Sequence, residues 1–293
     1  MKQHHGLIYA ICAYTFWGVV PIFWKQLDHI GSFEIIAHRM VWSFLIVIAL
    51  IVLLAQWKSF VSIFSQKRVL LRSGFAACFI VSNWFMFIWA VTNEHLVQIS
   101  MGYFINPLIS VMLGVLLFGD RFRRGQLIPL GIMVVAVLYL VIMQGQLPWV
   151  ALFLASTFAS YSAVKKTIKL SAVQGMAIET GAFFVPAIAY LFFIDGQASG
   201  SFGTQVSISV LLSLAGFFTI VPLLLFTAAA KHSTMTLLGM TQYICPSLQL
   251  LIGVFVYKES FGQTQLIAFC LIWFALVIYS LDQLKFQKQQ SKP

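Results

Sequence analysis

The chain has 293 residues, of which 60% are hydrophobic and 9% are charged, and its formal net charge is +10. Soluble domains carry about a quarter charged residues, so this composition excludes a soluble globular fold. The Lys and Arg residues lie in short gaps between long apolar runs, whereas a nucleic-acid-binding protein gathers them on one solvated face. The composition indicates a polytopic membrane protein, surrounded by lipid and without a nucleic-acid partner.

Ten apolar runs are long enough to cross a bilayer as helices, for which about 20 residues are needed. The expected spans are residues 6–24, 33–55, 70–91, 97–118, 125–143, 148–167, 174–194, 206–229, 235–257 and 261–281. Short joins near residues 145 and 231 leave nine spans as the alternative count. The runs are too long for barrel strands, which have about ten residues and alternate strictly. The sequence predicts an all-α integral membrane fold with ten transmembrane helices.

The distribution of positive charge predicts the orientation. With ten spans, fifteen Lys and Arg residues fall on one side, and only Lys25 and Lys258 fall on the other, while Arg39 lies within a span. Cytoplasmic loops are enriched in Lys and Arg. We therefore expect a multi-pass protein of the inner (plasma) membrane with both termini in the cytoplasm. A nine-span arrangement would mix the two sets of charges.

Two segments outside the spans have their own predictions. Trp57, Phe60, Val61 and Phe64 have helical spacing between basic residues, which predicts an amphipathic helix on the cytoplasmic leaflet. Residues 284–293 are expected to be a disordered cytoplasmic tail.

The chain contains an internal duplication, because two stretches share a Met, a Pro, a Gly, an acidic residue and a Gln in one register. They are Met101, Pro107, Gly114, Asp120 and Gln126 in the first stretch, and Met240, Pro246, Gly253, Glu259 and Gln265, each 139 residues later, in the second. The chain then divides into five-helix repeats at 1–144 and 145–283. Since five is odd, the second repeat enters the membrane in the opposite orientation. Inverted repeats are typical of secondary transporters.

Several short motifs together resemble the RarD branch of the EamA-type drug/metabolite transporter superfamily. They are Ala13-Tyr-Thr-Phe-Trp-Gly18, Glu34-x3-His38-Arg39, Asn83-Trp84, Gly102-Tyr-Phe-Ile-Asn-Pro107, Ile178-Glu-Thr180, Val221-Pro-Leu and Gln242-Tyr-Ile-x-Pro246. The resemblance extends over essentially the whole chain. It implies a ten-helix inner-membrane transporter of two inverted repeats, in a family whose names refer to chloramphenicol sensitivity. It does not identify a substrate.

The sequence has no signature of catalysis or of a bound cofactor. It lacks a P-loop, a G-x-S-x-G motif and a pair of His residues spaced for a metal within a span. We therefore expect no enzyme activity, no cofactor and no metal site.

Polar side chains inside the spans are candidate functional groups, because burying them in hydrocarbon costs free energy. The first group is Glu34, His38 and Arg39 in the second span. In the structural interpretation, Glu34 and His38 tie two helices together while Arg39 extends to the membrane surface. In the functional interpretation, the three groups take part in gating or coupling.

A second group of aromatic and amide side chains suits a planar or zwitterionic organic solute. It consists of Asn83, Trp84, Tyr103, Asn106, Gln242 and Tyr243. Helix-to-helix hydrogen bonds and interfacial aromatic belts are the alternative roles. Pro107 and Pro246 are expected to be paired hinges or static kinks.

The duplication also suggests a gate at each membrane surface. A Lys at one helix end and a Glu on the next helix recur as Lys25 with Glu34 outside, and as Lys165 or Lys166 with Glu179 inside. Alternate breaking of the two pairs would switch access, although snorkelling lysines and a structural Glu179 are the alternative.

Together these features predict a secondary transporter that exports or exchanges a small organic solute by alternating access. Protons are a candidate coupling ion, and a homodimer is a candidate assembly. An uncoupled facilitator is the first alternative, and an integral membrane enzyme or lipid-modifying subunit is the second.

Overall fold

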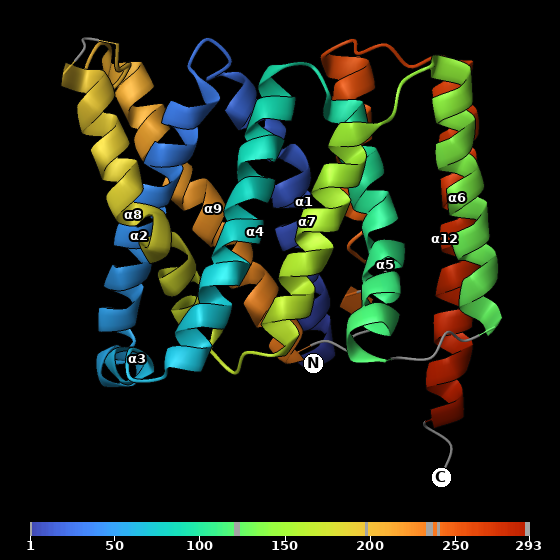
Figure 1. Ribbon diagram of the computed structural model, residues 1–293, viewed down its shortest axis with the longest axis horizontal. Coiled ribbons are helices and arrows are strands. Elements are labelled where there is room, and N and C mark those ends of the chain that lie inside the picture. The colour runs from blue at the N-terminus through green and yellow to red at the C-terminus, as the bar shows by residue number, and fades with distance from the viewer. Residues whose placement is uncertain (1, 120–123, 197–198, 233–236, 239–240, 291–293) are drawn as a thin grey trace. The chain divides into compact units, whose positions relative to one another are not determined.

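The computed structural model describes residues 2–119, 124–196, 199–232, 237–238 and 241–290, which form helices joined by short connections (Figure 1). In chain order the helices are α1 (Lys2–Lys25), α2 (Ser32–Leu53), α3 (Trp57–Ile63), α4 (Lys67–Thr92), α5 (Leu96–Phe118), α6 (Arg124–Gln144), α7 (Trp149–Lys166), α8 (Ala172–Gly196), α9 (Val206–His232), α11 (Ile244–Leu251), the π-helical turn η1 (Ile252–Val256) and α12 (Gln263–Gln290). No strand occurs in these ranges. The predicted all-α fold is confirmed.

Eight of the described helices are long and apolar enough to cross a membrane, and they match eight of the ten predicted spans. They are α1, α2, α4, α5, α6, α8, α9 and α12. The predicted span 148–167 is α7, which has 18 residues and ends in two lysines. The described part of the predicted span 235–257 includes the shorter apolar stretch Ile244–Val256. Helices suit a bilayer because they satisfy their backbone hydrogen bonds internally.

The chain forms two compact units, and each unit takes helices from both halves of the sequence. Unit 1 comprises Met1–Val19, Glu94–Ala159 and Ala228–Pro293, and unit 2 comprises Val20–Asn93 and Ser160–Thr227. The compact units are thus a different division from the predicted repeats 1–144 and 145–283. Helices related by the duplication pack against each other within a unit, as α2 with α8 and α6 with α12 (Figure 1). The same holds for α5 with α11.

Unit 2 is built around α2 and α8. Its core includes Val47 and Ile51 of α2, Met176 and Ile178 of α8, and Ile220 of α9. Glycines allow these helices to approach closely, as small residues do in membrane bundles. A Cβ at position 216 of α9 would lie 2.6 Å from the backbone carbon of Trp42.

Unit 1 is built around α5, α6 and α12. Its core includes Phe104 and Leu108 of α5, Leu140 of α6 and Phe269 of α12. At Gly102 of α5, an added Cβ would lie 2.7 Å from the carbonyl oxygen of Ala151 in α7. This position therefore tolerates no side chain without a shift of backbone.

The predicted amphipathic helix is α3, and its apolar residues divide between two surroundings. Phe60 is buried in the core of unit 2. Trp57, Val61 and Phe64 are exposed. The helix therefore packs on the protein through one face and presents an apolar face outward, as an interfacial helix does.

Candidate functional site

Two stretches of seven residues in α2 and α8 are buried without interruption. They are residues 34–40 of α2 and residues 174–180 of α8. The offset of 140 residues between them agrees closely with the offset of the sequence duplication. In this register Arg39 corresponds to Glu179. The two packed helices thus carry opposite charges at equivalent buried positions.

Glu179 is held by two groups of α7. Lys165 Nζ lies 2.6 Å from Glu179 Oε1, and the Tyr161 hydroxyl donates to Glu179 Oε2 at 3.1 Å. The Glu179 side chain is 2% exposed and that of Lys165 is 28% exposed. Both carboxylate oxygens therefore have donors, as a buried charge requires. Of the two lysines considered from the sequence, Lys165 rather than Lys166 makes this ion pair.

A glycine one turn before the glutamate makes room for the ammonium group. A Cβ at Gly175 would overlap Lys165 Nζ. Residues four apart lie on one helix face, so Gly175 and Glu179 together form the surface that receives Lys165.

Arg39 is buried against aromatic rings. Its Cζ lies 4.3 Å from the ring centroid of Trp84 in α4 and 5.3 Å from that of Trp24 in α1. The side chain is 7% exposed. These are cation–π geometries, which gain strength when desolvated. The end of α1 thus contacts Arg39 much as the end of α7 contacts Glu179.

Glu34 and His38 contact the segment that precedes α9. Glu34 Oε1 accepts a hydrogen bond from Ser201 N at 2.6 Å, and Oε2 accepts one from Ser201 Oγ at 3.1 Å. The His38 ring stacks on Phe202 at 4.9 Å. Both side chains are 5% exposed. They join α2 to this segment.

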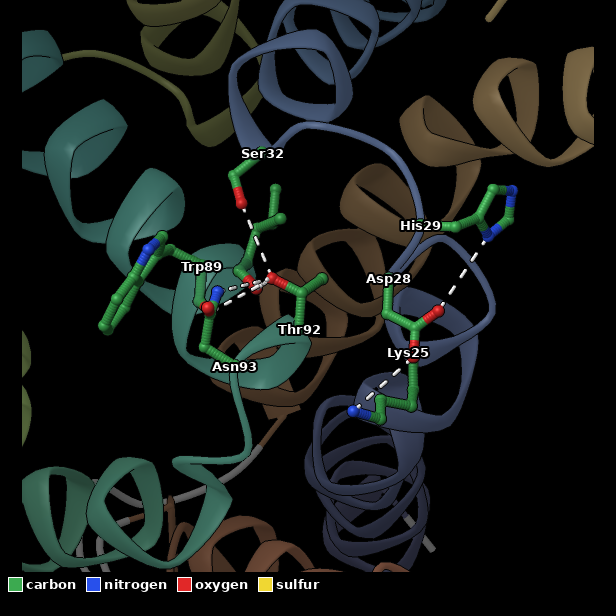
Figure 2. A network of polar contacts seen from close by, with 8 residues as sticks. Lys25, Asp28, His29, Ser32, Trp89, Thr92 and Asn93 are labelled. Carbon is green, nitrogen blue, oxygen red and sulfur yellow. Dashed lines mark hydrogen bonds and ion pairs between the residues drawn. The ribbon is translucent and has the colours of Figure 1, made fainter.

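The expected Lys25–Glu34 ion pair is not among the described contacts. Lys25 Nζ lies 3.5 Å from Asp28 Oδ2, and Asp28 also faces His29, with Oδ1 3.8 Å from Nδ1 (Figure 2). The acidic residue three positions further along the chain is closer to the lysine in space, and Glu34 is occupied by Ser201. The Lys25–Glu34 gate stays a prediction, and in this structure Glu34 contacts Ser201.

A separate polar network joins the start of α2 to the end of α4. Ser32 Oγ lies 3.5 Å from Thr92 Oγ1, and the Asn93 amide donates to the Trp89 carbonyl at 2.8 Å (Figure 2). Trp89 therefore lies in the last turn of α4.

The register of the two buried stretches differs from the predicted equivalence of Glu34 with Glu179. In this register Glu34 corresponds to Gln174, whose Nε2 donates to Ser59 Oγ of α3 at 3.0 Å. Glu34 binds the segment before α9, and Gln174 binds α3, which precedes α4. The first turns of α2 and α8 therefore make corresponding contacts in the two halves.

The predicted solute-binding residues fall in both units. Asn83 and Trp84 belong to unit 2, and Tyr103, Asn106, Gln242 and Tyr243 belong to unit 1. The Asn106 Oδ1 atom is buried and has no hydrogen-bond partner among the described residues. The Tyr243 ring stacks on Phe104 at 6.2 Å, and Tyr103 contacts Phe158 edge-on. A common pocket for Asn106 and Gln242 remains a prediction.

The two matched prolines have different local surroundings. Pro107 lies inside α5. Pro246 lies in the first turn of α11, where a missing N–H is tolerated. The Gln242 carbonyl, which loses its usual donor at Pro246, accepts from Cys245 N at 3.3 Å. Pro246 therefore lies in the first turn of a described helix, whereas Pro107 lies inside one, and the hinge role of the two prolines stays a prediction.

Two polar residues that the site predictions omit have defined roles in unit 1. The Glu259 carboxylate accepts hydrogen bonds from Leu96 N at 2.6 Å and Val97 N at 2.8 Å, so it caps α5. Gln249 is 1% exposed and donates through Nε2 to the Trp17 carbonyl at 3.3 Å. The duplication draws attention to Glu259, because it is equivalent to Asp120. Nothing in the sequence spacing identifies the start of α5 as its partner.

Apolar helices with ionisable side chains buried between them define a multi-pass membrane protein with internal polar sites, the arrangement that solute transporters use. Comparison with known proteins makes the assignment specific. Residues 4–142 match the EamA-like transporter family. The chain belongs to the RarD branch of this family of membrane transporters.

Two relatives and one solved structure illustrate the similarity. The chain is 39% identical to Protein RarD of Streptomyces exfoliatus, over 97% of this chain and 90% of the relative. It is 37% identical to the uncharacterized transporter YojE of Bacillus subtilis, over 97% and 96%. A solved structure titled "Crystal structure of protein" aligns with a TM-score of 0.59 at 15% identity, covering 97% of this chain and 99% of the other. This last likeness concerns the fold alone.

Proposed function

We propose that the protein is a secondary transporter that exports or exchanges a small organic solute, such as a drug, an amino acid or a metabolite, by alternating access. In this proposal it resides in the inner membrane with both termini in the cytoplasm, and it has no enzyme activity. The two inverted five-helix repeats, 1–144 and 145–283, exchange conformations to produce the inward-open and outward-open states. The contacts between duplicated helices, α2 with α8 and α6 with α12, support this role for the repeats.

The observation that carries the proposal is the Lys165–Glu179 pair at the end of α7. Two unit charges about 4 Å apart attract by about 4 kcal/mol at an effective dielectric constant of 20. Such a contact is strong enough to hold two helix ends together and weak enough to break during a transport cycle. A pair of apolar residues would hold the helices without the possibility of switching.

Proton coupling follows from the same contact. Lys165 and Tyr161 both donate to the Glu179 carboxylate, and protonation of the carboxylate would remove its charge and weaken the attraction to Lys165. We therefore assign the inner gate, and the coupling to protons, to Glu179. At the other end of unit 2, the Glu34–Ser201 contact replaces the Lys25–Glu34 pair as the candidate outer gate.

The solute-binding role is assigned to amide and aromatic side chains. Asn106 has a buried oxygen that lacks a partner among the described residues, and such an atom gains free energy from a donor on a ligand. The Arg39 guanidinium lies over the face of the Trp84 ring. The guanidinium suits a carboxylate of the solute, and the ring suits an aromatic or planar part.

Uptake by purified protein in liposomes tests the proposal. Amino acids, amphenicols and related metabolites are screened with and without a pH gradient, and the active solute is then measured in the Lys165→Met and Lys166→Met variants. We expect Lys165→Met to abolish accumulation driven by the pH gradient and Lys166→Met to retain it. Accumulation that does not respond to the gradient would favour the uncoupled facilitator. Conversion of a lipid or solute to a new product would favour the enzyme.

Access from each side provides a second test. A single cysteine at position 106 in a cysteine-free background is labelled from the cytoplasmic and external faces. We expect Glu179→Gln to raise cytoplasmic labelling and Glu34→Gln to raise external labelling. Equal effects on both faces would contradict the gate. Light scattering of the purified protein measures whether it forms the proposed homodimer.

A further inference from the structure

A cavity of about 220 Å³ lies within unit 2, between the start of α2 and the end of α8. We call it the acidic cavity. Its walls include Glu34, His38, Leu191, Phe192, Asp195 and Phe202. At about 30 Å³ per water molecule, its volume corresponds to roughly seven waters. It is large enough for a small organic group.

The charge of this cavity is unbalanced. Glu34 and Asp195 both line it, and none of its lining residues is a Lys or an Arg. Among the described ion pairs, neither carboxylate has a cationic partner. Asp195 lies in the last turn of α8, where the helix dipole is negative and disfavours an acid. A bound cation would neutralise the two carboxylates and would interact favourably with the negative end of the α8 dipole.

His38 supplies an independent indication of a ligand. Its side chain is 5% exposed, and Nε2 is buried without a hydrogen-bond partner among the described residues. Buried polar atoms are normally hydrogen-bonded, so an unpartnered one needs an explanation. A neutral imidazole has one nitrogen that accepts a hydrogen bond, which suits an ammonium donor.

The remaining walls define the rest of the ligand. Leu191 and Phe192 are apolar, and the Phe202 ring stacks on His38. Aromatic faces and apolar walls favour an alkylammonium group over a strongly hydrated metal ion. Among the described residues, no group of three His, Cys, Asp or Glu side chains could hold a metal. The carboxylates of Glu34 and Asp195 would repel an anionic ligand from the cavity.

Gly200 leaves room for the second carboxylate. A Cβ at this position would lie 2.8 Å from Asp195 Oδ1. The segment that carries Gly200 is tied down by Ser201, which donates to Glu34, and by Thr204, which donates to the Ser201 carbonyl at 2.6 Å. The acidic cavity is therefore a built feature of the fold.

We propose that the acidic cavity binds a protonated primary amine with a short alkyl chain, whose ammonium group lies among Glu34, His38 and Asp195. This site lies wholly within unit 2 and does not depend on the transported solute or on the direction of transport. The proposal gives Glu34 and His38, the buried polar residues of α2 that line the cavity, a class of ligand.

Calorimetry with the full-length protein in detergent micelles tests the proposal without any transport. Butylammonium chloride is titrated at neutral pH, with butanol as the neutral analogue and sodium butyrate as the anion. We expect saturable binding of butylammonium alone. Glu34→Gln and Asp195→Asn should each weaken it by at least about tenfold, or about 1.4 kcal/mol. Asp28→Asn, which removes a carboxylate outside the cavity, should leave it unchanged.

Three results would overturn the site. The first is the absence of saturable binding to the wild type, and the second is equal binding of butanol, which would indicate a merely apolar cavity. The third is an unchanged affinity in both cavity variants. Asp195 is exposed, so Asp195→Asn tests the site even if Glu34→Gln fails to fold. A negative result in calorimetry would not contradict the proposed transport function, because the uptake assay tests the Lys165–Glu179 pair instead.

Discussion

Removing either member of the Lys165–Glu179 pair should destabilise the protein, but by very different amounts. Lys165→Met leaves the Glu179 carboxylate, 2% exposed, with Tyr161 as its remaining donor. Loss of one partner from a buried pair destabilises by about 3–5 kcal/mol. Glu179→Gln leaves an ammonium that is 28% exposed and can turn to solvent. We therefore expect this second change to destabilise by about 1 kcal/mol, the scale of one ordinary hydrogen bond.

The measurement is unfolding of the purified variants in mixed micelles, followed by tryptophan fluorescence. The double variant Lys165→Met with Glu179→Gln completes the cycle, since the two residues are in contact and their effects should not add. We expect it to be more stable than Lys165→Met alone, because the orphaned charge is gone. Equal losses in the two single variants, or a double variant equal to their sum, would refute the reasoning.

Three further predictions concern packing, capping and topology. Gly102→Val should prevent assembly of the folded protein, because a Cβ would lie 2.7 Å from the Ala151 carbonyl oxygen; a soluble, monodisperse variant with wild-type melting would contradict this. Glu259→Ala should lower the free energy of unfolding by about 0.5–2 kcal/mol through loss of the α5 cap, and hydrogen exchange should rise first in the opening turn of α5. A cysteine at position 67 should react with an impermeant reagent only after the cells are opened, whereas labelling of intact cells would reverse the predicted orientation.

The sequence alone was sufficient to predict the helices and the family. Runs of about 20 apolar residues specify membrane helices because length and hydropathy are local properties. The motifs at Glu34-x3-His38-Arg39 and Gly102-Tyr-Phe-Ile-Asn-Pro107 were also sufficient to identify the RarD branch, which the relatives confirm. The polar candidates in α2 and α8 were predicted because each charged residue within an apolar run stands out.

Only the tertiary structure decided which side chains meet. Lys165 with Glu179 was within reach of the sequence pattern, and Lys25 with Asp28 is a local contact between residues three apart. The contact of Glu34 with Ser201 could not be predicted from the sequence. A helix that is apolar on all sides has no periodic signal to show which face is buried. Its rotation, and therefore the partner of each polar group, is set by close packing at small residues of neighbouring helices. Contacts between segments more than 160 residues apart, as for Glu34 and Ser201, depend on that packing and on nothing local in the chain.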